Sequence, residues 1–247
     1  MYKIITISVV VLIAFVFISF NFQTNFLSQQ KRYKNVRTAY SKKESVIVKN
    51  INAQGIKIDE LNILITVYKA EKKLNLYVKK NTNTNYVKLT TFSICRSSGD
   101  LGPKREQGDY QVPEGYYYIN RYNPASSYYL SLGINYPNKS DTIISSANNL
   151  GGDIFIHGNC CTIGCLPMTD DKIMEIYLYA INARNNGQIK IPVYIFPFNM
   201  TDENLIKYKK NKNVNFWTKL KIGYDIFNKE NKELNYSIDK YGNYNFR

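Results

Sequence analysis

The chain has 247 residues, and 33 Lys and Arg against 19 Asp and Glu give it a net charge of +14. A hydrophobic content of 44% with 21% charged residues is typical of a globular protein and excludes a largely disordered one. Four cysteines are too few for a disulfide scaffold at this length. The single histidine, His157, excludes metal sites that need two or more histidines, and any histidine base must be this residue.

The excess of basic residues favours an anionic partner, such as nucleic acid, an anionic membrane surface or an acidic polymer. The lysines are scattered along the chain, however, and no helix-turn-helix, zinc-finger or RNA-binding motif accompanies them. We therefore interpret the charge as a solvated basic surface and expect no nucleic-acid partner.

The chain begins with an apolar run at residues 4–20 that contains no charged residue. A run of about 17 residues is at the lower limit for a helix that spans a bilayer. No convincing cleavage site follows, so residues 1–22 are predicted to be an uncleaved signal anchor, with a cleaved signal peptide as the alternative. Basic residues after the run would place the chain in the cytoplasm by the positive-inside rule, but the chemistry described below favours export.

The next segment, residues 23–58, is polar and basic without sustained periodicity, which predicts a basic tether or a frayed helical segment. Residues 59–198 are predicted to form one domain that is mainly β with a few helices, an α+β fold. Two β-rich runs, 63–68 and 74–78, flank a charged turn and predict a hairpin.

Further elements follow the hairpin. Additional strands are expected over residues 86–95, 116–119, 154–156 and 192–196. A helix is expected to begin at Thr169, which suits an N-cap and precedes apolar residues on one face. Residues 199–247 are predicted to be a C-terminal extension packed on the domain, with an amphipathic helix around Trp217 and a terminal hairpin over residues 236–246.

The segment HGNCCTIGCLPM, residues 157–168, carries the clearest chemistry. A cysteine nucleophile needs a base to form its thiolate, and an imidazole is best matched to this task near neutral pH. Gly164 precedes Cys165 and permits an unusual backbone conformation there. The helix predicted just afterward would direct backbone N–H groups toward an acyl oxyanion. The pattern favours a cysteine acyl-transfer enzyme with His157 as its base.

Three other interpretations of the same residues stay open. His157, Cys165 and either Cys160 or Cys161 could bind zinc, although the spacing matches no common zinc finger. Either Cys160 or Cys161 could also pair with Cys95 in an oxidising compartment, which is compatible with catalysis. Finally, a lone histidine in an apolar setting is more often a satisfied core residue than a catalyst.

The motif His-Gly-x-Cys-x-x-x-Gly-Cys is matched by His157, Gly158, Cys160, Gly164 and Cys165. Residues 61–197 as a whole resemble the L,D-transpeptidase catalytic-domain family of bacterial cell-wall enzymes, in the branch that has this compact motif. The same branch is matched by the segments 94–104, 107–109, 113–117, 131–132, 136–138 and 195–198, and by the spacing of aromatic residues in the tail. The resemblance implies a β-sandwich of mixed sheets.

The resemblance also implies roles for residues of the motif. Cys165 would be the nucleophile and His157 the general base. The carbonyl of Gly158 would orient the imidazole, and the N–H groups of Gly164 and Cys165 are candidates for the oxyanion hole. The family does not need a metal or an organic cofactor for this chemistry.

The sequence departs from the family at one place that concerns substrate binding. Many members have Ser-His-Gly-Cys-x-Arg, and this chain lacks both the second histidine and the arginine. Recognition of a substrate carboxylate must then come from elsewhere, and Lys104, Arg105 and Arg121 are the candidates.

The expected reaction is acyl transfer through a Cys165 thioester at a diaminopimelate-type centre of a peptidoglycan stem peptide. An amine acceptor would give transpeptidation, and water would give an amidase or carboxypeptidase. A non-catalytic wall-binding module is the alternative from another class. The expected partners are stem peptides, with a wall-anchored lipoprotein as an alternative, and the inner membrane through the N-terminus. The expected location is the periplasmic face of the cell envelope.

Overall fold

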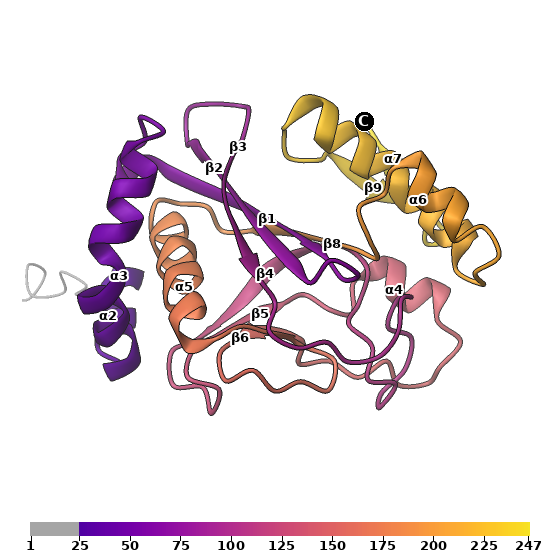
Figure 1. Ribbon diagram of the computed structural model, residues 1–247, viewed down its shortest axis with the longest axis horizontal. Helices are drawn as coiled ribbons and strands as arrows, with labels where there is room; N and C mark the ends of the chain where they lie inside the picture. The colour runs from indigo at the N-terminus through magenta and orange to yellow at the C-terminus, as the bar shows by residue number, and fades with distance from the viewer. Residues whose placement is uncertain (1–24) are drawn as a thin grey trace, which may run out of the picture.

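A computed structural model describes residues 25–247 (Figure 1). The predicted signal anchor at residues 1–22 lies outside this range. Over residues 25–247, none of the helices combines the length and the apolar character needed to cross a membrane.

The centre of the fold is one mixed sheet of eight strands in the order β3-β2-β1-β8-β4-β5-β6-β7. The β1–β8 and β6–β7 pairs are parallel, and the other neighbours are antiparallel. The strands are β1 (Leu61–Tyr68), β2 (Lys73–Lys80), β3 (Val87–Ser93), β4 (Gly115–Asn123), β5 (Ser131–Ile134), β6 (Phe155–His157), β7 (Leu166–Pro167) and β8 (Ile191–Phe196).

The α+β class is confirmed, but the expected sandwich of mixed sheets is wrong. Strand β8 pairs with β1 on one side and with β4 on the other, so it joins the two halves into a continuous sheet. All six residues of β8 are buried, as expected for a central strand that is covered on both faces. The predicted hairpin is confirmed as β1 and β2, which pair antiparallel from Leu61–Lys80 to Tyr68–Lys73.

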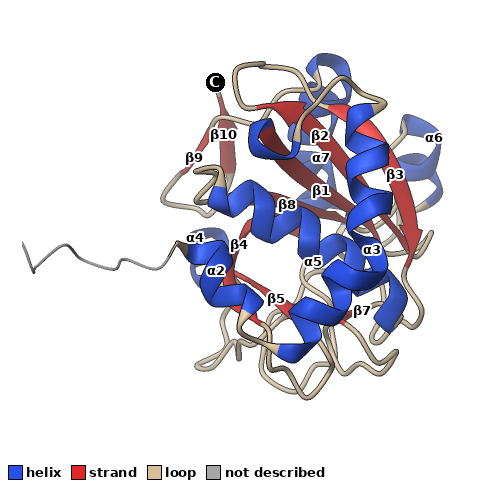
Figure 2. Ribbon diagram, turned by 90° about the vertical axis from the view of Figure 1, so that its left-hand side faces the viewer, coloured by secondary structure: helices blue, strands red, loops and turns tan. Residues whose placement is uncertain are grey.

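One face of the sheet is covered by α5 (Asp170–Asn185), with α2 (Phe26–Lys31) and α3 (Lys34–Asn52) packed outside it (Figures 1 and 2). Helix α5 begins as predicted, because the Thr169 side chain accepts a hydrogen bond from the Lys172 N–H. Residues 23–58 were predicted to be a basic tether or a frayed helical segment. Their described part is instead a packed helical layer, which is followed by the short 3₁₀ helix η1 (Ile58–Glu60).

Helix α3 was not predicted from the sequence, because its apolar stripe is narrow. Val36, Ala39, Ile47 and Ile51 are fully buried, but the mostly polar residues 40–46 separate the first two from the last two. Lys43 strengthens the packing from the polar side, since its Nζ lies 2.7 Å from Asp171 and 3.0 Å from Glu175 on α5.

The opposite face is covered by the C-terminal extension, which includes the predicted amphipathic helix and terminal hairpin. Alternate residues of β1 divide between the two faces, as the period of a strand requires: Ile63 and Ile65 belong to the core under α5, and Leu64 to the core under α7. The elements are α6 (Asp202–Lys207), α7 (Val214–Glu230), β9 (Tyr236–Ile238) and β10 (Tyr244–Phe246), while α4 (Lys139–Ile144) lies between β5 and β6 in sequence.

A buried ion pair connects the sheet with this extension. The Lys69 ammonium, in the turn after β1, lies 2.9 Å from the Glu114 carboxylate and donates to the carbonyls of Gly102 and Val112 at 2.7 and 2.9 Å. Glu114 is fully buried and also accepts hydrogen bonds from the Gly102 N–H at 2.8 Å and the Trp217 indole N–H at 2.7 Å. One carboxylate thus links the β1–β2 turn, the loop before β4 and helix α7.

We expect Glu114→Gln to destabilise the fold by about 3–5 kcal/mol, because it leaves the Lys69 ammonium buried without a counter-charge. Urea unfolding of the wild type and the variant measures this difference. Glu106→Gln is the matched control, because Glu106 is exposed on the same loop and its loss should change stability by less than about 0.5 kcal/mol. Equal stability of the two variants would contradict the structural role of Glu114.

Candidate active site

The two residues proposed to catalyse acyl transfer lie at two adjacent short strands, His157 as the last residue of β6 and Cys165 immediately before β7. Strand β6 ends at His157 and β7 begins at Leu166, and the parallel register pairs Ile156 with Leu166 and His157 with Pro167. Cys165 therefore lies beside Phe155, whose N–H lies 3.4 Å from the Cys165 Sγ. The intervening loop returns the chain to the same edge of the sheet, which brings the predicted base and nucleophile into one region.

The imidazole of His157 is held in one orientation. Its Nδ1 lies 2.6 Å from the Gly158 carbonyl oxygen, and its ring centroid lies 4.7 Å from that of Tyr128. Because a carbonyl can only accept, Nδ1 carries the proton of the neutral ring and Nε2 is left as the basic atom. This is the geometry expected for Gly158, although a catalytic role for it remains a prediction.

Glycine is required at position 158 because neighbouring groups approach its backbone closely. A Cβ there would lie 2.5 Å from an Asp170 carboxylate oxygen and 2.8 Å from the Tyr128 carbonyl oxygen. At position 164 the reason is conformational, since Gly164 has φ of +131°, a region that other residues rarely adopt. The unusual backbone predicted before Cys165 is therefore present.

Burial favours the neutral form of both the His157 imidazole and the Cys165 thiol. Desolvation lowers the pKa of His157 below its ordinary value of 6.5, although the hydrogen bond to the Gly158 carbonyl opposes this. Desolvation also raises the pKa of the Cys165 thiol above its ordinary value of 9.0, while the Phe155 N–H acts in the opposite direction. Both directions favour a neutral thiol and a neutral imidazole over a thiolate–imidazolium pair.

In the described part of the chain, no hydrogen bond joins the His157 ring to the Cys165 thiol. The thiol instead lies 3.5 Å from the Asp153 carbonyl oxygen. Catalytic hydrogen bonds are often long in ligand-free sites and shorten when substrate binds. The register thus places Cys165 beside Phe155, two residues before His157 along β6, without an established proton path between thiol and imidazole.

The predicted oxyanion donors already have a partner, Thr162. Its Oγ1 accepts hydrogen bonds from the Gly164 N–H at 3.2 Å and the Cys165 N–H at 2.8 Å, and its hydroxyl donates to the Cys165 carbonyl at 2.9 Å. Thr162 was not among the site residues expected from the sequence. A threonine two and three residues before backbone N–H groups commonly accepts from them, and that spacing was the available signal.

The first turn of α5 binds the loop that follows His157. Asp170 in its first turn accepts from the Asn159 N–H at 2.9 Å, and Thr169 caps the helix. These contacts hold the base-bearing loop, so the first turn of the helix does not contact Cys165 in the way that the sequence analysis expected.

The three cations proposed to bind a substrate carboxylate are each paired with a carboxylate of the chain. Lys104 is buried against Asp109, Arg105 lies 3.1 Å from Asp141, and Arg121 pairs with Asp153 at the surface. Their roles in substrate binding remain predictions.

Cys165 lines a cavity of about 260 Å³. Its other walls come from the β1–β2 turn, Ile94, residues 96–101, Val112 and Leu166, and its cations are Lys69, Lys72 and Arg96. None of the three predicted substrate-binding cations lines it. No sequence pattern indicates this cavity, because its walls are far apart in the chain.

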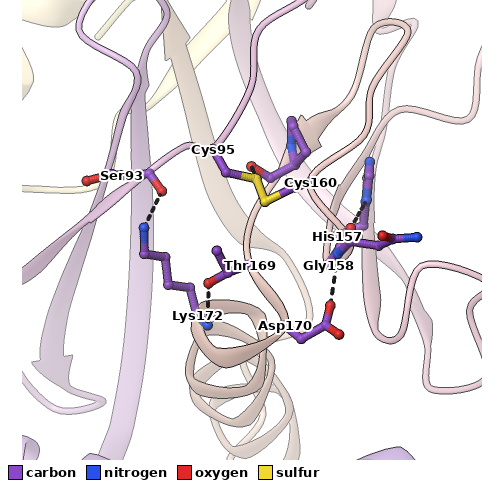
Figure 3. The surroundings of a disulfide bond; sticks show 10 residues. Ser93, Cys95, His157, Gly158, Cys160, Thr169, Asp170 and Lys172 are labelled. Carbon is purple, nitrogen blue, oxygen red and sulfur yellow. Dashed lines mark hydrogen bonds between the residues drawn. A yellow bond between two sulfur atoms is a disulfide. The ribbon is translucent and has the colours of Figure 1, made fainter.

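A disulfide joins Cys95 to Cys160, and Cys161 and Cys165 are free thiols (Figure 3). It connects the end of the segment that follows β3 to the loop after His157, while Lys172 on α5 donates to the Ser93 carbonyl at 2.9 Å beside it. Of the alternatives left open by the sequence, Cys160 is the partner of Cys95, which removes Cys160 as a zinc ligand.

The neutral pair predicts a particular pH dependence. Protonation of His157 abolishes the base. The midpoint of the acid limb of the kcat/KM profile should therefore lie below pH 6.5, because burial lowers the pKa of His157.

In a Cys161→Ala background, alkylation of Cys165 by iodoacetamide should be slow at neutral pH and rise toward pH 9 and above, because burial raises the thiol pKa. Rapid alkylation that stays constant down to pH 5 would instead show a preformed ion pair.

The disulfide should stabilise the domain by constraining the unfolded chain. For a sequence separation of 65 residues, the loop-entropy relation gives about 4 kcal/mol. We expect the Cys95→Ser, Cys160→Ser double variant to lose up to this amount in urea unfolding, and Cys161→Ser to change little. A double variant as stable as the Cys161 control would contradict the assigned pairing.

Comparison with known proteins gives one family. A sequence profile of the L,D-transpeptidase catalytic domain (YkuD) matches residues 62–195. The putative L,D-transpeptidase YafK of Escherichia coli K12 is 39% identical over 178 residues, which are 71% of this chain and 70% of that protein. The protein of the same description from Escherichia coli O157:H7 gives the same values.

Two solved structures are similar at lower levels. The helical cell shape determining protein Pgp2 of Campylobacter jejuni is 19% identical with a TM-score of 0.44, over 72% of this chain and 74% of that one. Bdellovibrio bacteriovorus Bd1075 is 19% identical with a TM-score of 0.39, over 71% and 74% of the two chains.

Proposed function

Because the chain belongs to the L,D-transpeptidase catalytic domain family, we propose that it modifies peptidoglycan by acyl transfer through a thioester on Cys165. The donor is a stem peptide with a diaminopimelate-type residue. The observation that carries the proposal is the β6–β7 register, which brings His157 and Cys165 to one edge of the sheet, where Cys165 lines a cavity.

In the first step the Cys165 thiol attacks the carbonyl carbon of the donor and the Nε2 of His157 takes the thiol proton. The tetrahedral intermediate then collapses, the C–N bond breaks, and the departing amine receives this proton. A thioester and a neutral imidazole remain. The hydrogen bond from Nδ1 to the Gly158 carbonyl stabilises the imidazolium that forms between these events.

In the second step an amine or a water molecule attacks the thioester, again with His157 as the base, and the Cys165 thiol is released. An amine acceptor completes a crosslink or attaches a protein to the wall, and water gives amidase or carboxypeptidase activity. The N–H groups of Gly164 and Cys165 would bind the oxyanion, which requires the Thr162 hydroxyl to give up these donors. No step uses a metal or organic cofactor.

We further propose that the protein acts at the periplasmic face of the cell envelope, anchored through residues 1–22 in the inner membrane. The Cys95–Cys160 disulfide supports an oxidising compartment. The net charge of +14 is suited to an anionic polymer such as the wall. Stem peptides are the proposed partners, and a wall-anchored lipoprotein is an alternative one.

Replacement of Cys165 by alanine tests the mechanism. We expect Cys165→Ala to lower product formation from sacculi and defined tetrapeptide muropeptides by at least about 1,000-fold, because the nucleophile is lost. Mass spectrometry of the products measures the change. Cys161→Ala is the matched control, since Cys161 is the other free thiol of the described chain and should leave turnover within a few-fold.

The products also decide the direction of the reaction. New crosslinks or amine exchange that depend on Cys165 would establish transpeptidation, and water-cleaved fragments would establish a hydrolase. If no product depends on Cys165, the enzyme proposal fails and the non-catalytic wall-binding module takes its place.

A further inference from the structure

The cavity beside Cys165 has the size and walls for a small, partly apolar group. Its volume of about 260 Å³ is just below the range of about 300–1,000 Å³ that is typical of sites for drug-sized ligands. The apolar part of the wall is formed by Ala70, Ile94, Leu101, Val112 and Leu166. A short aliphatic chain would therefore be desolvated next to the nucleophile.

Some of the charged side chains that line the cavity have no partner within residues 25–247. The ammonium of Lys69 is neutralised by Glu114. In contrast, Lys72, Arg96 and Asp100 form no ion pair and no side-chain hydrogen bond within residues 25–247, and all three are exposed. Two free cations and one free anion thus border an apolar space.

A buried hydroxyl in the same wall has no partner. The Oγ of Ser98 is inaccessible to solvent and forms no hydrogen bond with the described protein. Buried polar atoms are nearly always paired, so the unpaired Ser98 hydroxyl is an exception within the segment that forms this wall.

The wall that carries these groups is fixed in place. Cys95, immediately before Arg96, is held by the disulfide. The Asp100 N–H donates to the Gln111 side chain at 3.1 Å, and a Cβ at Gly99 would lie 2.7 Å from the same Gln111 oxygen. The Ile94 N–H donates to the Lys72 carbonyl at 2.8 Å, which joins the turn to this segment. The charges are therefore presented by a constrained backbone.

We propose that this cavity binds the free amino-acid end of the acyl donor, a group that carries both a carboxylate and an ammonium. Arg96 and Lys72 bind the carboxylate, where the planar guanidinium can form two parallel hydrogen bonds. Asp100 binds the ammonium, and the apolar wall takes the aliphatic chain that leads to the acyl carbon on Cys165. This inference rests on the proposed function and assigns the carboxylate recognition for which Lys104, Arg105 and Arg121 were the first candidates.

The test pairs changes in the full chain with changes in the substrate. Three tetrapeptide donors are compared: one with a free side-chain carboxylate and ammonium at residue 3, one with this carboxylate amidated, and one with this ammonium acetylated. Removal of a hydrogen bond to a charged group corresponds to a loss of about 10-fold or more. We expect the wild type to prefer the free donor by at least this factor in kcat/KM.

Arg96→Gln should lose about 10-fold or more on the free donor and remain unchanged on the amidated one, so that the preference disappears. Asp100→Asn should do the same for the free and acetylated donors. Lys73→Gln is the matched control, because Lys73 is exposed in the neighbouring position but does not line the cavity, and it should keep both preferences. Equal losses on all donors, or no loss, would overturn the proposal.

Calorimetric titration of the Cys165→Ala chain with the same three peptides separates this inference from the proposed function. Carboxylate-dependent binding that Arg96→Gln removes supports the cavity assignment even if no turnover is found, in which case the enzyme proposal alone fails. Cys165-dependent turnover without any discrimination among the three donors retains the enzyme proposal and rejects the cavity assignment.

Discussion

The buried ion pair between Lys69 and Glu114 constrains more of this molecule than any other contact described above. Glu114 is fully buried and binds Lys69, the Gly102 N–H and the Trp217 indole, so the turn after β1, the loop before β4 and helix α7 share one carboxylate. Neither charge is left without hydrogen bonds, which is the condition under which a buried pair is tolerated. Because Lys69 also lines the cavity beside Cys165, the C-terminal extension contributes indirectly to the shape of the candidate active site.

The chemistry of the site is set by burial rather than by strong charges. Desolvation favours a neutral His157 and a neutral Cys165, and the Gly158 carbonyl fixes which nitrogen of the ring is basic. In the proposed mechanism charge develops only when the thiol attacks, and the Gly158 carbonyl is already in place to stabilise the imidazolium. The unpaired cations, Lys72 and Arg96, lie at the cavity instead of against the thiol, which suits groups that position a substrate more than groups that activate a nucleophile.

The sequence was informative where the signal is local. Alternating apolar residues predicted the β1–β2 hairpin, the cap at Thr169 predicted α5, and the motif from His157 to Cys165 predicted two residues that the fold brings to one sheet edge. It failed where the outcome depends on distant partners. Strand β8 joins the two halves of the sheet, and helix α3 buries its narrow apolar stripe only by packing on α5. The ion pair between Arg105 and Asp141 likewise joins residues that are distant in the sequence. No local sequence pattern indicates the cavity wall at Arg96, because this wall forms only when the segment after β3 reaches β7 in the folded chain.

The Cys95–Cys160 bond also closes a covalent ring that contains β4, β5, α4 and β6. His157 lies inside this ring, and Cys165 lies just beyond its closing residue. A protease that cuts once in an exposed loop of the ring, such as residues 145–153, leaves both fragments in one covalent molecule with the base still attached to the nucleophile. A cut between Cys160 and Cys165 has the opposite result, because only non-covalent packing then holds the two together. The connectivity of the chain therefore protects one side of the site against nicking and leaves the short segment around Thr162 as its covalent weak point.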